Sequence, residues 1–284
     1  MIYIIIPVHN RIQYTLTCLE SLSSQTYRDY LIILVNDGST DGTSEKIADK
    51  YPGVKVLEGN GQLWWSASTN LGVKYALSLS GSQKDFILTL NNDLVVRENY
   101  LAEFFSAAGR FPDTLIGSLA VDIEAPDTIH YAGTIWNSRT SVYRRVKMLS
   151  RDELLGSRQG LLSTSLLPGR GTLIPVPVFK KIGLYDHRQF PHYMGDEDFA
   201  LRARKAGYKL GIWAGAIVYS HIHETGMMQQ KKNFRYYRDF FTSIKSHGNS
   251  RYRWNWAKRH ARVHPLLYFV LDLARQIRTL VLKD

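Results

Sequence analysis

The sequence predicts an α/β protein: an α/β sandwich of the nucleotide-binding type, with a mostly parallel sheet and a basic, helical C-terminal extension. Three observations lead to this fold class. Short β-branched runs alternate with segments of helical period, which is typical of βαβ units. The length of 284 residues suits one α/β domain with an extension. Most of the net charge of +11 falls in the last fifth of the chain.

The first half of the chain contains the alternating elements. Residues 2–6 and 31–35 are β-branched runs of the kind found in strands that are buried on both faces of a parallel sheet. Between them we predict a helix that Asn10 caps and in which leucines recur at helical spacing. The later predicted elements are a turn and helix start at 39–43, a strand at 54–57, a helix at 67–79 and a strand at 86–90.

Two acidic turns come directly after predicted strands. The strand at 31–35 ends in a turn that contains Asp37, and the strand at 86–90 ends in a turn that contains Asp93. In an open α/β sheet, ligands bind outside the carboxyl ends of the strands, so these carboxylates can converge on one substrate and one metal ion. The alternative for each residue, taken singly, is a turn former or a helix cap.

The first strand does not lead into a phosphate-binding loop. It continues into Pro7-Val8-His9-Asn10-Arg11, whereas dinucleotide-binding proteins have G-x-G-x-x-G at this point, and no Walker A sequence occurs. A substrate that carries phosphate therefore needs another charge partner. Asp93 and the neighbouring amide oxygens offer hard oxygen ligands, which suit Mg²⁺ or Mn²⁺.

The C-terminal segment is both basic and aromatic. Residues 231–284 contain 13 Lys and Arg against three Asp, which accounts for +10 of the net +11, and ten aromatic side chains are interleaved with them. We therefore predict a domain at 1–225 and a basic, aromatic-rich helical extension at 226–284. Such a mixture suits an anionic surface, either phospholipid headgroups or nucleic acid. The alternative is a solvated face on helices that pack against the main domain or a second subunit.

Residues near the end of the chain are spaced for one apolar helix face. They are Leu266, Leu267, Phe269, Val270, Leu273, Ile277, Leu280 and Val281.

Cysteine content and hydropathy indicate a cytoplasmic protein. Cys18 is the one cysteine, so an internal disulfide framework is excluded. The chain opens directly on a strand without a basic segment or a cleavage site, and no uncharged run approaches the roughly 20 residues of a spanning helix. We expect a cytoplasmic location, with peripheral contact to the membrane as a possibility that the basic tail raises.

Taken together, the motifs resemble those of the inverting family 2 glycosyltransferases with the GT-A fold, over roughly residues 1–225. Each motif alone is weak, but their joint order and spacing are specific. They are Ile6-Pro7-Val8-His9-Asn10-Arg11, Asn36-Asp37-Gly38-Ser39-Thr40-Asp41-Gly42, Gly59-Asn60-Gly61, Ser68-Thr69-Asn70-Leu71-Gly72, Asn91-Asn92-Asp93, Gly169-Arg170-Gly171, Gly183-Leu184-Tyr185-Asp186, and Gly195-Asp196-Glu197-Asp198 with Leu201-Arg202-Ala203-Arg204.

The resemblance implies a site for a nucleoside diphosphate sugar. In it, Asp37 accepts a hydrogen bond from the base. The implied donor-binding residues are Pro7, His9, Asn10, Arg11, Asp37, Asn60, Trp65, Asn70, Asn92, Gly169, Arg170 and Gly171. Trp64 and Trp65 could equally form a platform for a sugar or a buried aromatic pair.

The resemblance also implies a divalent cation, Mg²⁺ or Mn²⁺. The family usually has Asp-x-Asp where this chain has Asn91-Asn92-Asp93, so Asp93 is the only carboxylate of the element. A further ligand is expected from the segment after the catalytic helix, with His221 favoured over His223. The alternative for a lone histidine at a strand end is surface or core packing.

The acidic run Asp196-Glu197-Asp198 supplies the candidate catalytic residues. In the family pattern the base lies six residues before the arginine of the following helix and another acid lies four residues before it. With Arg202 as that arginine, Asp196 is the general base, Asp198 is a helix-start acid that orients Arg202 or the acceptor, and Glu197 faces elsewhere. The alternative is an acidic first turn that the helix dipole stabilises.

The function implied by the resemblance is transfer of a sugar from a UDP- or dTDP-linked donor to a hydroxyl of a glycan or lipid-linked acceptor. The family branch with an Asn-Asn-Asp element resembles the rhamnosyltransferases of bacterial cell-surface polysaccharide synthesis. Two alternatives are a nucleotidyltransferase of related fold and a nucleic-acid-binding protein that acts through the basic tail. Against nucleic acid, the excess charge is confined to the tail. A homodimer is compatible with the sequence.

Overall fold

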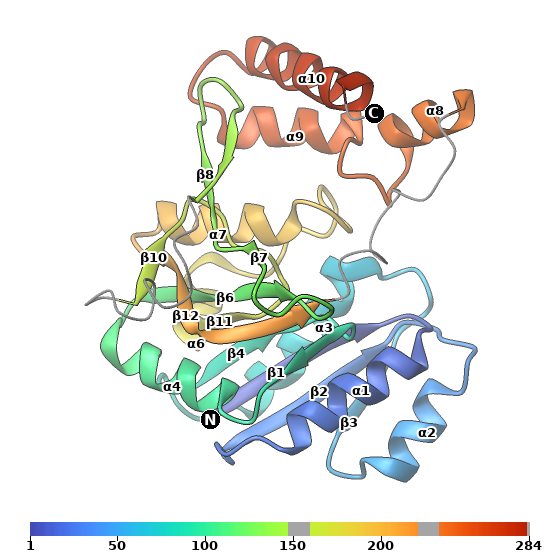
Figure 1. Ribbon diagram of the computed structural model, residues 1–284, viewed down its shortest axis with the longest axis vertical. Coiled ribbons are helices and arrows are strands. Elements are labelled where there is room, and N and C mark those ends of the chain that lie inside the picture. The colour runs from blue at the N-terminus through green and yellow to red at the C-terminus, as the bar shows by residue number, and fades with distance from the viewer. Residues whose placement is uncertain (147–159, 221–232, 283–284) are drawn as a thin grey trace.

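The computed structural model describes residues 1–146, 160–220 and 233–282, and shows a three-layer α/β/α sandwich with three helices stacked at one end (Figure 1). The central sheet has ten strands, and its main path runs β10-β12-β6-β11-β4-β1-β2-β3. Six strands point in one direction, because β3, β2, β1 and β4 are parallel, and β11 is antiparallel to both β4 and β6, while β12 is parallel to β6. The predicted mostly parallel α/β sandwich is thereby confirmed.

The strands of this sheet follow the predicted runs closely in the first half of the chain. Their bounds are β1 Ile2–Val8, β2 Tyr30–Asn36, β3 Lys55–Glu58, β4 Phe86–Thr89, β5 Leu94–Val96, β6 Thr114–Asp122, β7 Ile129–Tyr131, β10 Leu161–Ser163, β11 Thr172–Pro175 and β12 Lys209–Ser220. Strand β5 pairs with β12, and β7 pairs with β6.

Helices cover both faces of the sheet, because alternate residues of β1 point to opposite sides. Ile2, Ile4 and Ile6 belong to the core under one set of helices, and Tyr3 and Ile5 to the core under the other. The first set is α1 Ile12–Ser23, α2 Thr43–Lys50 and α4 Tyr100–Arg110. The second set is α3 Trp64–Leu79, α6 Val176–Ile182 and α7 Gly195–Lys205.

The start of α1 differs from the expected Asn10 cap. Arg11 is the N-cap residue, its backbone is left-handed with φ of 65°, and its side chain makes no capping bond. The Ile12 amide instead donates to Oδ2 of Asp41, 2.9 Å away, from the turn after β2. The side chain of Asn10 accepts from the Thr40 amide at 2.9 Å. The predicted cap is therefore wrong, because a residue 29 positions later in the chain reaches the free amide first.

Of the C-terminal helices, α9 Ser250–His260 packs on α7, and α8 Phe234–Thr242 packs on α9. Helix α10 Pro265–Leu282 packs on α9 and on a hairpin of two strands, β8 Thr134–Trp136 and β9 Tyr143–Arg145 (Figure 1). A separate apolar core joins them to the main domain, with Trp256 and Tyr268 fully buried beside Phe190. The indole Nε1 of Trp136 donates to the hydroxyl of Tyr268 at 2.9 Å. The expected helical extension is present. The predicted boundary at 225/226 lies outside the described residues.

Candidate functional site

The two acidic turns lie at the carboxyl ends of parallel strands, on either side of the turn that follows β1. Asp93 follows β4, and its Oδ2 accepts from Nη1 of Arg11, which follows β1, at 3.1 Å. The side chain of Arg11 is 39% exposed and that of Asp93 is 11% exposed. The ion pair therefore lies at a surface that solvent reaches, where a phosphate could approach the guanidinium.

Asp37 organises the loop that follows β3. Its Oδ1 accepts from the Gly61 amide at 2.8 Å, and its Oδ2 accepts from the amides of Leu63 at 2.9 Å and Trp64 at 3.1 Å. A Cβ on Gly59 would lie 2.6 Å from this carboxylate, so only glycine fits there. Three backbone donors saturate most of the carboxylate, so Asp37 holds the loop after β3 in place.

The residues predicted around the base lie at this edge of the sheet. Nδ1 of His9 is 2.7 Å from the carbonyl oxygen of Asp37, which joins the turns after β1 and β2. Asn10 holds the turn after β2 through Thr40. Asn60 is exposed and its side chain accepts from the Gln62 amide, whereas Pro7 is half-buried at the end of β1. His9, Asn10 and Asn60 thus line one solvent-accessible edge together.

Trp65 connects three of the predicted motifs. Its Nε1 donates to Oδ1 of Asn91 at 3.2 Å, and its ring meets that of Tyr185 edge-on at 5.3 Å between centroids. A Cβ on Gly169 would lie 2.0 Å from Cζ2 of Trp65, so the Gly169 backbone rests directly on the indole. Trp65 is therefore a packed aromatic residue, and its indole ring contacts the backbone of the turn at Gly169.

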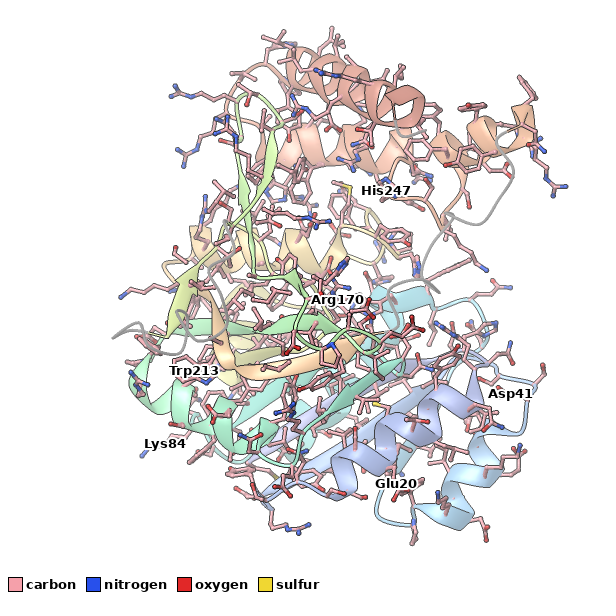
Figure 2. All side chains as sticks on the ribbon, viewed as in Figure 1. Glu20, Asp41, Lys84, Arg170, Trp213 and His247 are labelled. Carbon is pink, nitrogen blue, oxygen red and sulfur yellow. The ribbon has the colours of Figure 1, made fainter. Side chains whose placement is uncertain are left out.

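The turn 169–171 carries the most central cation of the site. Figure 2 shows Arg170 in the middle of the molecule, between the sheet and the C-terminal helices. Burial lowers the pKa of Arg170, and the charges of Asp93 and Asp196 oppose this effect, so the guanidinium lies within electrostatic reach of both. Gly171 has φ of +80°, and a Cβ there would lie 2.3 Å from the Ser118 hydroxyl, which explains glycine at this position.

Asp196 opens α7 and faces this turn. Its Oδ2 accepts from the Gly169 amide at 2.7 Å, and its Oδ1 accepts from the Glu197 amide at 2.9 Å. Burial raises the pKa of the Asp196 carboxyl, and burial together with the charge of Asp196 raises the pKa of Glu197. A half-buried carboxylate of raised pKa is a stronger base than a free one, which suits proton removal.

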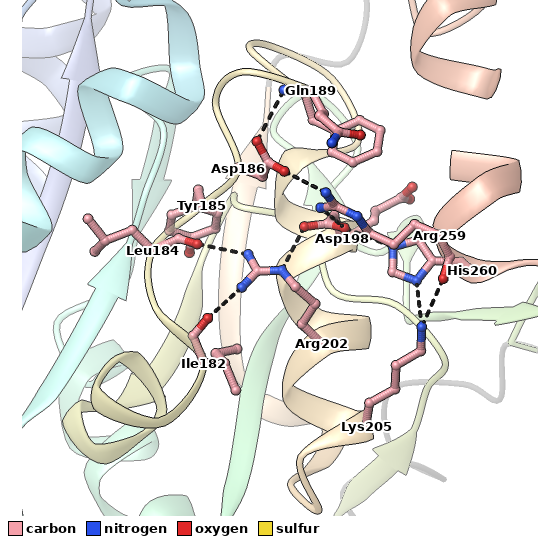
Figure 3. Close-up of polar contacts among 12 residues, drawn as sticks. Ile182, Leu184, Tyr185, Asp186, Gln189, Asp198, Arg202, Lys205, Arg259 and His260 are labelled. Atoms are coloured by element: carbon pink, nitrogen blue, oxygen red, sulfur yellow. Dashed lines mark hydrogen bonds and ion pairs between the residues drawn. The ribbon is translucent and has the colours of Figure 1, made fainter. Parts of the chain in front are cut away.

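Asp198 is held in a closed network (Figure 3). Its oxygens accept from Nε of Arg202 at 2.8 Å, Nη1 of Arg259 at 3.0 Å and Nε2 of His260 at 2.8 Å, and its side chain is fully buried. Burial alone would raise its pKa, but the hydrogen bond from His260 and the charge of Arg202 lower it to about 2. Asp198 is therefore ionised at all physiological pH values and has no open side toward a substrate.

The network ties the C-terminal helices to α7. Nη2 of Arg259 donates to Oδ2 of Asp186 at 2.6 Å, and Nζ of Lys205 donates to the Arg259 carbonyl at 3.0 Å (Figure 3). Burial lowers the pKa of His260, so the ring is neutral at neutral pH and donates its Nε2 proton to Asp198. The predicted orientation of Arg202 by Asp198 is present, whereas Arg259 and His260 were not foreseen.

Two predicted site residues lie elsewhere. The amide of Asn92 is buried and donates to the Thr15 hydroxyl on α1 at 2.9 Å. The amide of Asn70 bonds both the nitrogen and the carbonyl of Tyr185, and it lines a cavity of about 610 Å³ between α3 and the segment 184–188 that none of Asp93, Asp196 and Asp37 lines. His221 lies outside the described residues, so its role as a ligand stays a prediction.

A divalent cation fits the donor set at Asp93. Over residues 1–146, 160–220 and 233–282, no three side chains of His, Cys, Asp or Glu are placed to hold a metal together. Asp93 offers one carboxylate with hard oxygen atoms, and its side chain is 11% exposed beside Arg11. A single carboxylate suits a cation that takes its other ligands from substrate phosphates and water, as Mg²⁺ commonly does.

This mostly parallel sheet, with helices on both faces and acidic turns at the carboxyl ends of its strands, has the architecture of the GT-A fold. The profile of the family described as "Glycosyl transferase family 2" matches residues 3–182, and the chain belongs to that family.

Two solved structures and one curated relative show what this chain is similar to. GalNAc-T7 with UDP, GalNAc and Mn²⁺ superposes with a TM-score of 0.64 at 16% identity, over 98% of this chain and 57% of that one. The mannosyltransferase PcManGT from Pyrobaculum calidifontis, in complex with GDP-Man and Mn²⁺, gives 0.57 at 12% identity, over 100% of this chain and 76% of that one. An N-acetylglucosaminyl-diphospho-decaprenol L-rhamnosyltransferase of Mycobacterium tuberculosis is 25% identical over 233 residues, 73% of this chain and 72% of that protein.

Proposed function

We propose that the protein is an inverting transferase that moves a hexose or deoxyhexose from a UDP- or dTDP-sugar to a hydroxyl of a lipid-linked or glycan acceptor. The observation that carries this proposal is the placement of Asp196 against the Gly169 turn, with Arg170 within electrostatic reach of both Asp196 and Asp93. Displacement at an anomeric carbon needs a base for the acceptor hydroxyl and a cation for the leaving diphosphate. Asp196 and Arg170 would supply these two groups.

In the proposed reaction, Asp196 takes the proton of the acceptor hydroxyl. The freed oxygen attacks the anomeric carbon, and the bond from that carbon to the diphosphate oxygen breaks with inversion. Arg170 and Arg11 are placed to stabilise the negative charge that develops on the diphosphate. A divalent cation held by Asp93 would neutralise further charge on the same group. Asp198 takes no part in proton transfer, because its oxygens are occupied by Arg202, Arg259 and His260.

The relative from M. tuberculosis supports the choice of donor and acceptor. Its name specifies rhamnose transfer to an N-acetylglucosaminyl diphosphate decaprenol. We place the present reaction at the cytoplasmic face of a membrane, where a polyprenyl-linked acceptor of that kind is presented, in the synthesis of a cell-surface polysaccharide. Family membership supports a glycosyltransferase over the two alternatives, a nucleotidyltransferase and a nucleic-acid-binding protein.

The test is a turnover screen. UDP-, dTDP- and GDP-sugars are each incubated with Mn²⁺ or Mg²⁺ and an N-acetylglucosaminyl diphosphate lipid, and the released nucleoside diphosphate is measured. The anomeric configuration of the product is read by NMR. We expect one donor to be used and the configuration to invert. Retention of configuration, or no release with any donor, would contradict the proposal.

A further inference from the structure

Helix α10 carries an apolar face that the rest of the protein leaves uncovered. Its members recur at helical spacing, and each is between 38% and 54% exposed. They are Leu266, Leu267, Val270, Leu271 and Ile277, which we call the α10 face. Of the residues predicted to form one apolar stripe, Leu280 is buried and Phe269 and Leu273 are half-buried. The predicted stripe is therefore divided between a packed side and an open side.

The opposite side of α10 packs on the rest of the protein. The helix is therefore held in place although its α10 face is exposed. Tyr268 is fully buried and accepts from Trp136. Asp272 is 1% exposed and its carboxylate meets Nη1 of Arg253 on α9 at 3.3 Å. Arg275 donates to the Thr140 carbonyl at 2.9 Å, next to the β8–β9 hairpin. These contacts hold α10 in one orientation at the end of the molecule (Figure 1), with Tyr268 and Asp272 buried and the α10 face exposed.

Aromatic and basic side chains border the α10 face. The rings of Phe269 and Trp254 lie edge-on at 5.5 Å between centroids, and Nζ of Lys258 lies 5.8 Å from the Trp254 centroid. Arg278 is exposed on α10, directly after Ile277 of the α10 face. Tryptophan beside lysine at the edge of an apolar surface is typical of the interface between lipid headgroups and acyl chains.

We propose that the α10 face is a docking surface for an anionic phospholipid bilayer. Its five aliphatic side chains enter the boundary between headgroups and acyl chains, and Lys258 and Arg278 meet the lipid phosphates. The charge of the segment is complementary to such a surface, since residues 231–284 hold 13 cations against three acids. No helix among the described residues is long and apolar enough to cross a membrane, so the contact is peripheral.

Charge also decides against a second copy as the occupant. A two-fold contact places the same patch of both subunits together, so both sides of the apolar seam would carry the cations Lys258 and Arg278. Like charges brought together in this way destabilise the contact, whereas an anionic bilayer attracts the same cations.

The inference deepens the proposed lipid-linked acceptor by naming the surface that reaches the lipid. Helix α9 lies directly under α10 and ends at Arg259 and His260, which bond Asp198 near the start of α7. A bilayer on the α10 face is thus connected through two packed helices to the helix that carries Asp196. The acceptor headgroup would meet a catalytic helix held in a fixed orientation to the membrane.

The experiment is vesicle co-sedimentation of the full chain without any nucleotide sugar, so that its outcome is independent of the proposed reaction. Vesicles of phosphatidylcholine with phosphatidylglycerol are compared with pure phosphatidylcholine. The test variant is Val270→Glu with Ile277→Glu, and the matched control is Leu79→Glu, whose side chain is 47% exposed at the end of α3. A second variant, Lys258→Gln with Arg278→Gln, tests the charge.

We expect the wild-type protein and Leu79→Glu to bind the anionic vesicles. The partition coefficient of the double glutamate variant should be lower by a factor of about ten or more. Binding should fall between about 0.1 M and about 1 M NaCl, as the screening length shortens from about 10 Å to about 3 Å. The glutamine variant should show a smaller salt effect. Unchanged circular dichroism and melting temperature confirm that each variant is folded.

Three outcomes would overturn the proposal. The first is no binding of the wild-type protein to anionic vesicles at low salt. The second is equal binding by the α10 variant and Leu79→Glu. The third is a wild-type dimer that the α10 variant converts to a monomer in sedimentation velocity without any vesicle binding, which would assign the face to a second copy.

Discussion

Exchanging each of two neighbouring carboxylates for an amide separates a catalytic role from a structural one. Asp196→Asn keeps the size of the side chain and an oxygen that can accept from the Gly169 amide, but it removes the basic oxygen. Asp198→Asn removes a charge that Arg202, Arg259 and His260 surround. Asp196→Asn should lower kcat strongly and leave the protein folded. Asp198→Asn should lower the free energy of unfolding.

The expected magnitudes follow from these surroundings. General-base catalysis contributes roughly 10²–10⁴-fold, so Asp196→Asn should lose a factor of that order in kcat, with a change in unfolding free energy of about 1 kcal/mol or less. Asp198 is fully buried in its ion pairs, and removing one partner of a buried pair costs about 3–5 kcal/mol. For a chain of this size that corresponds to a fall in Tm of roughly 6–20 °C.

The assay combines nucleoside diphosphate release with urea unfolding of the same preparations. Asp239→Asn is the control, because Asp239 forms ion pairs with Arg238 and Arg235 at the surface and its loss should cost about 1 kcal/mol or less. If Asp198→Asn is as stable as the control but inactive, while Asp196→Asn retains turnover, the two assignments must be exchanged.

Three further predictions follow from the same geometry. The pKa of Asp198 is lowered to about 2, so its ionised form stabilises the fold above the unfolded-state pKa of about 3.9, and urea titrations should lose about 2 kcal/mol as the pH falls from about 5 to 2. Asp93→Ala should abolish transfer and leave the melting curve unchanged, and full activity of the wild-type enzyme in excess EDTA would refute a metal at this carboxylate. Gly169→Ala forces a methyl group against Trp65 and should cost about 1–3 kcal/mol in the wild-type background but less in a Trp65→Ala background, as a double-mutant cycle in urea unfolding would show; no loss in the single variant would refute this close packing.

The sheet and the acidic turns could be predicted because their signals are local. The run 31–35 is apolar and β-branched, and Asp37 follows it directly, so the place of Asp37 at a strand end needs no tertiary information. The same reasoning placed Asp93 after 86–90. The structure extends the first of these strands by one residue at each end, shortens the second by one residue, and moves neither.

Contacts between distant segments could not be predicted in the same way. Asp41 reaches the first amide of α1 across 29 residues, and a cap of this kind leaves no pattern around Asn10. Arg259 lies 61 residues after Asp198, in a segment whose charge suggested solvent or an anionic partner. A basic residue has the same sequence signature whether it meets water or a buried carboxylate, so the burial of this one became visible only in the folded chain.

The bond between α9 and α7 affects how this enzyme can be altered by recombination. A tail grafted from a relative would have to supply both a guanidinium at the place of Arg259 and an imidazole at the place of His260, or Asp198 would be left with Arg202 alone. Residues Trp136 and Phe190 would also lose the rings that cover them. We therefore expect active chimeras to arise only when the crossover lies outside this pair of helices, so that the catalytic helix and the tail are inherited together.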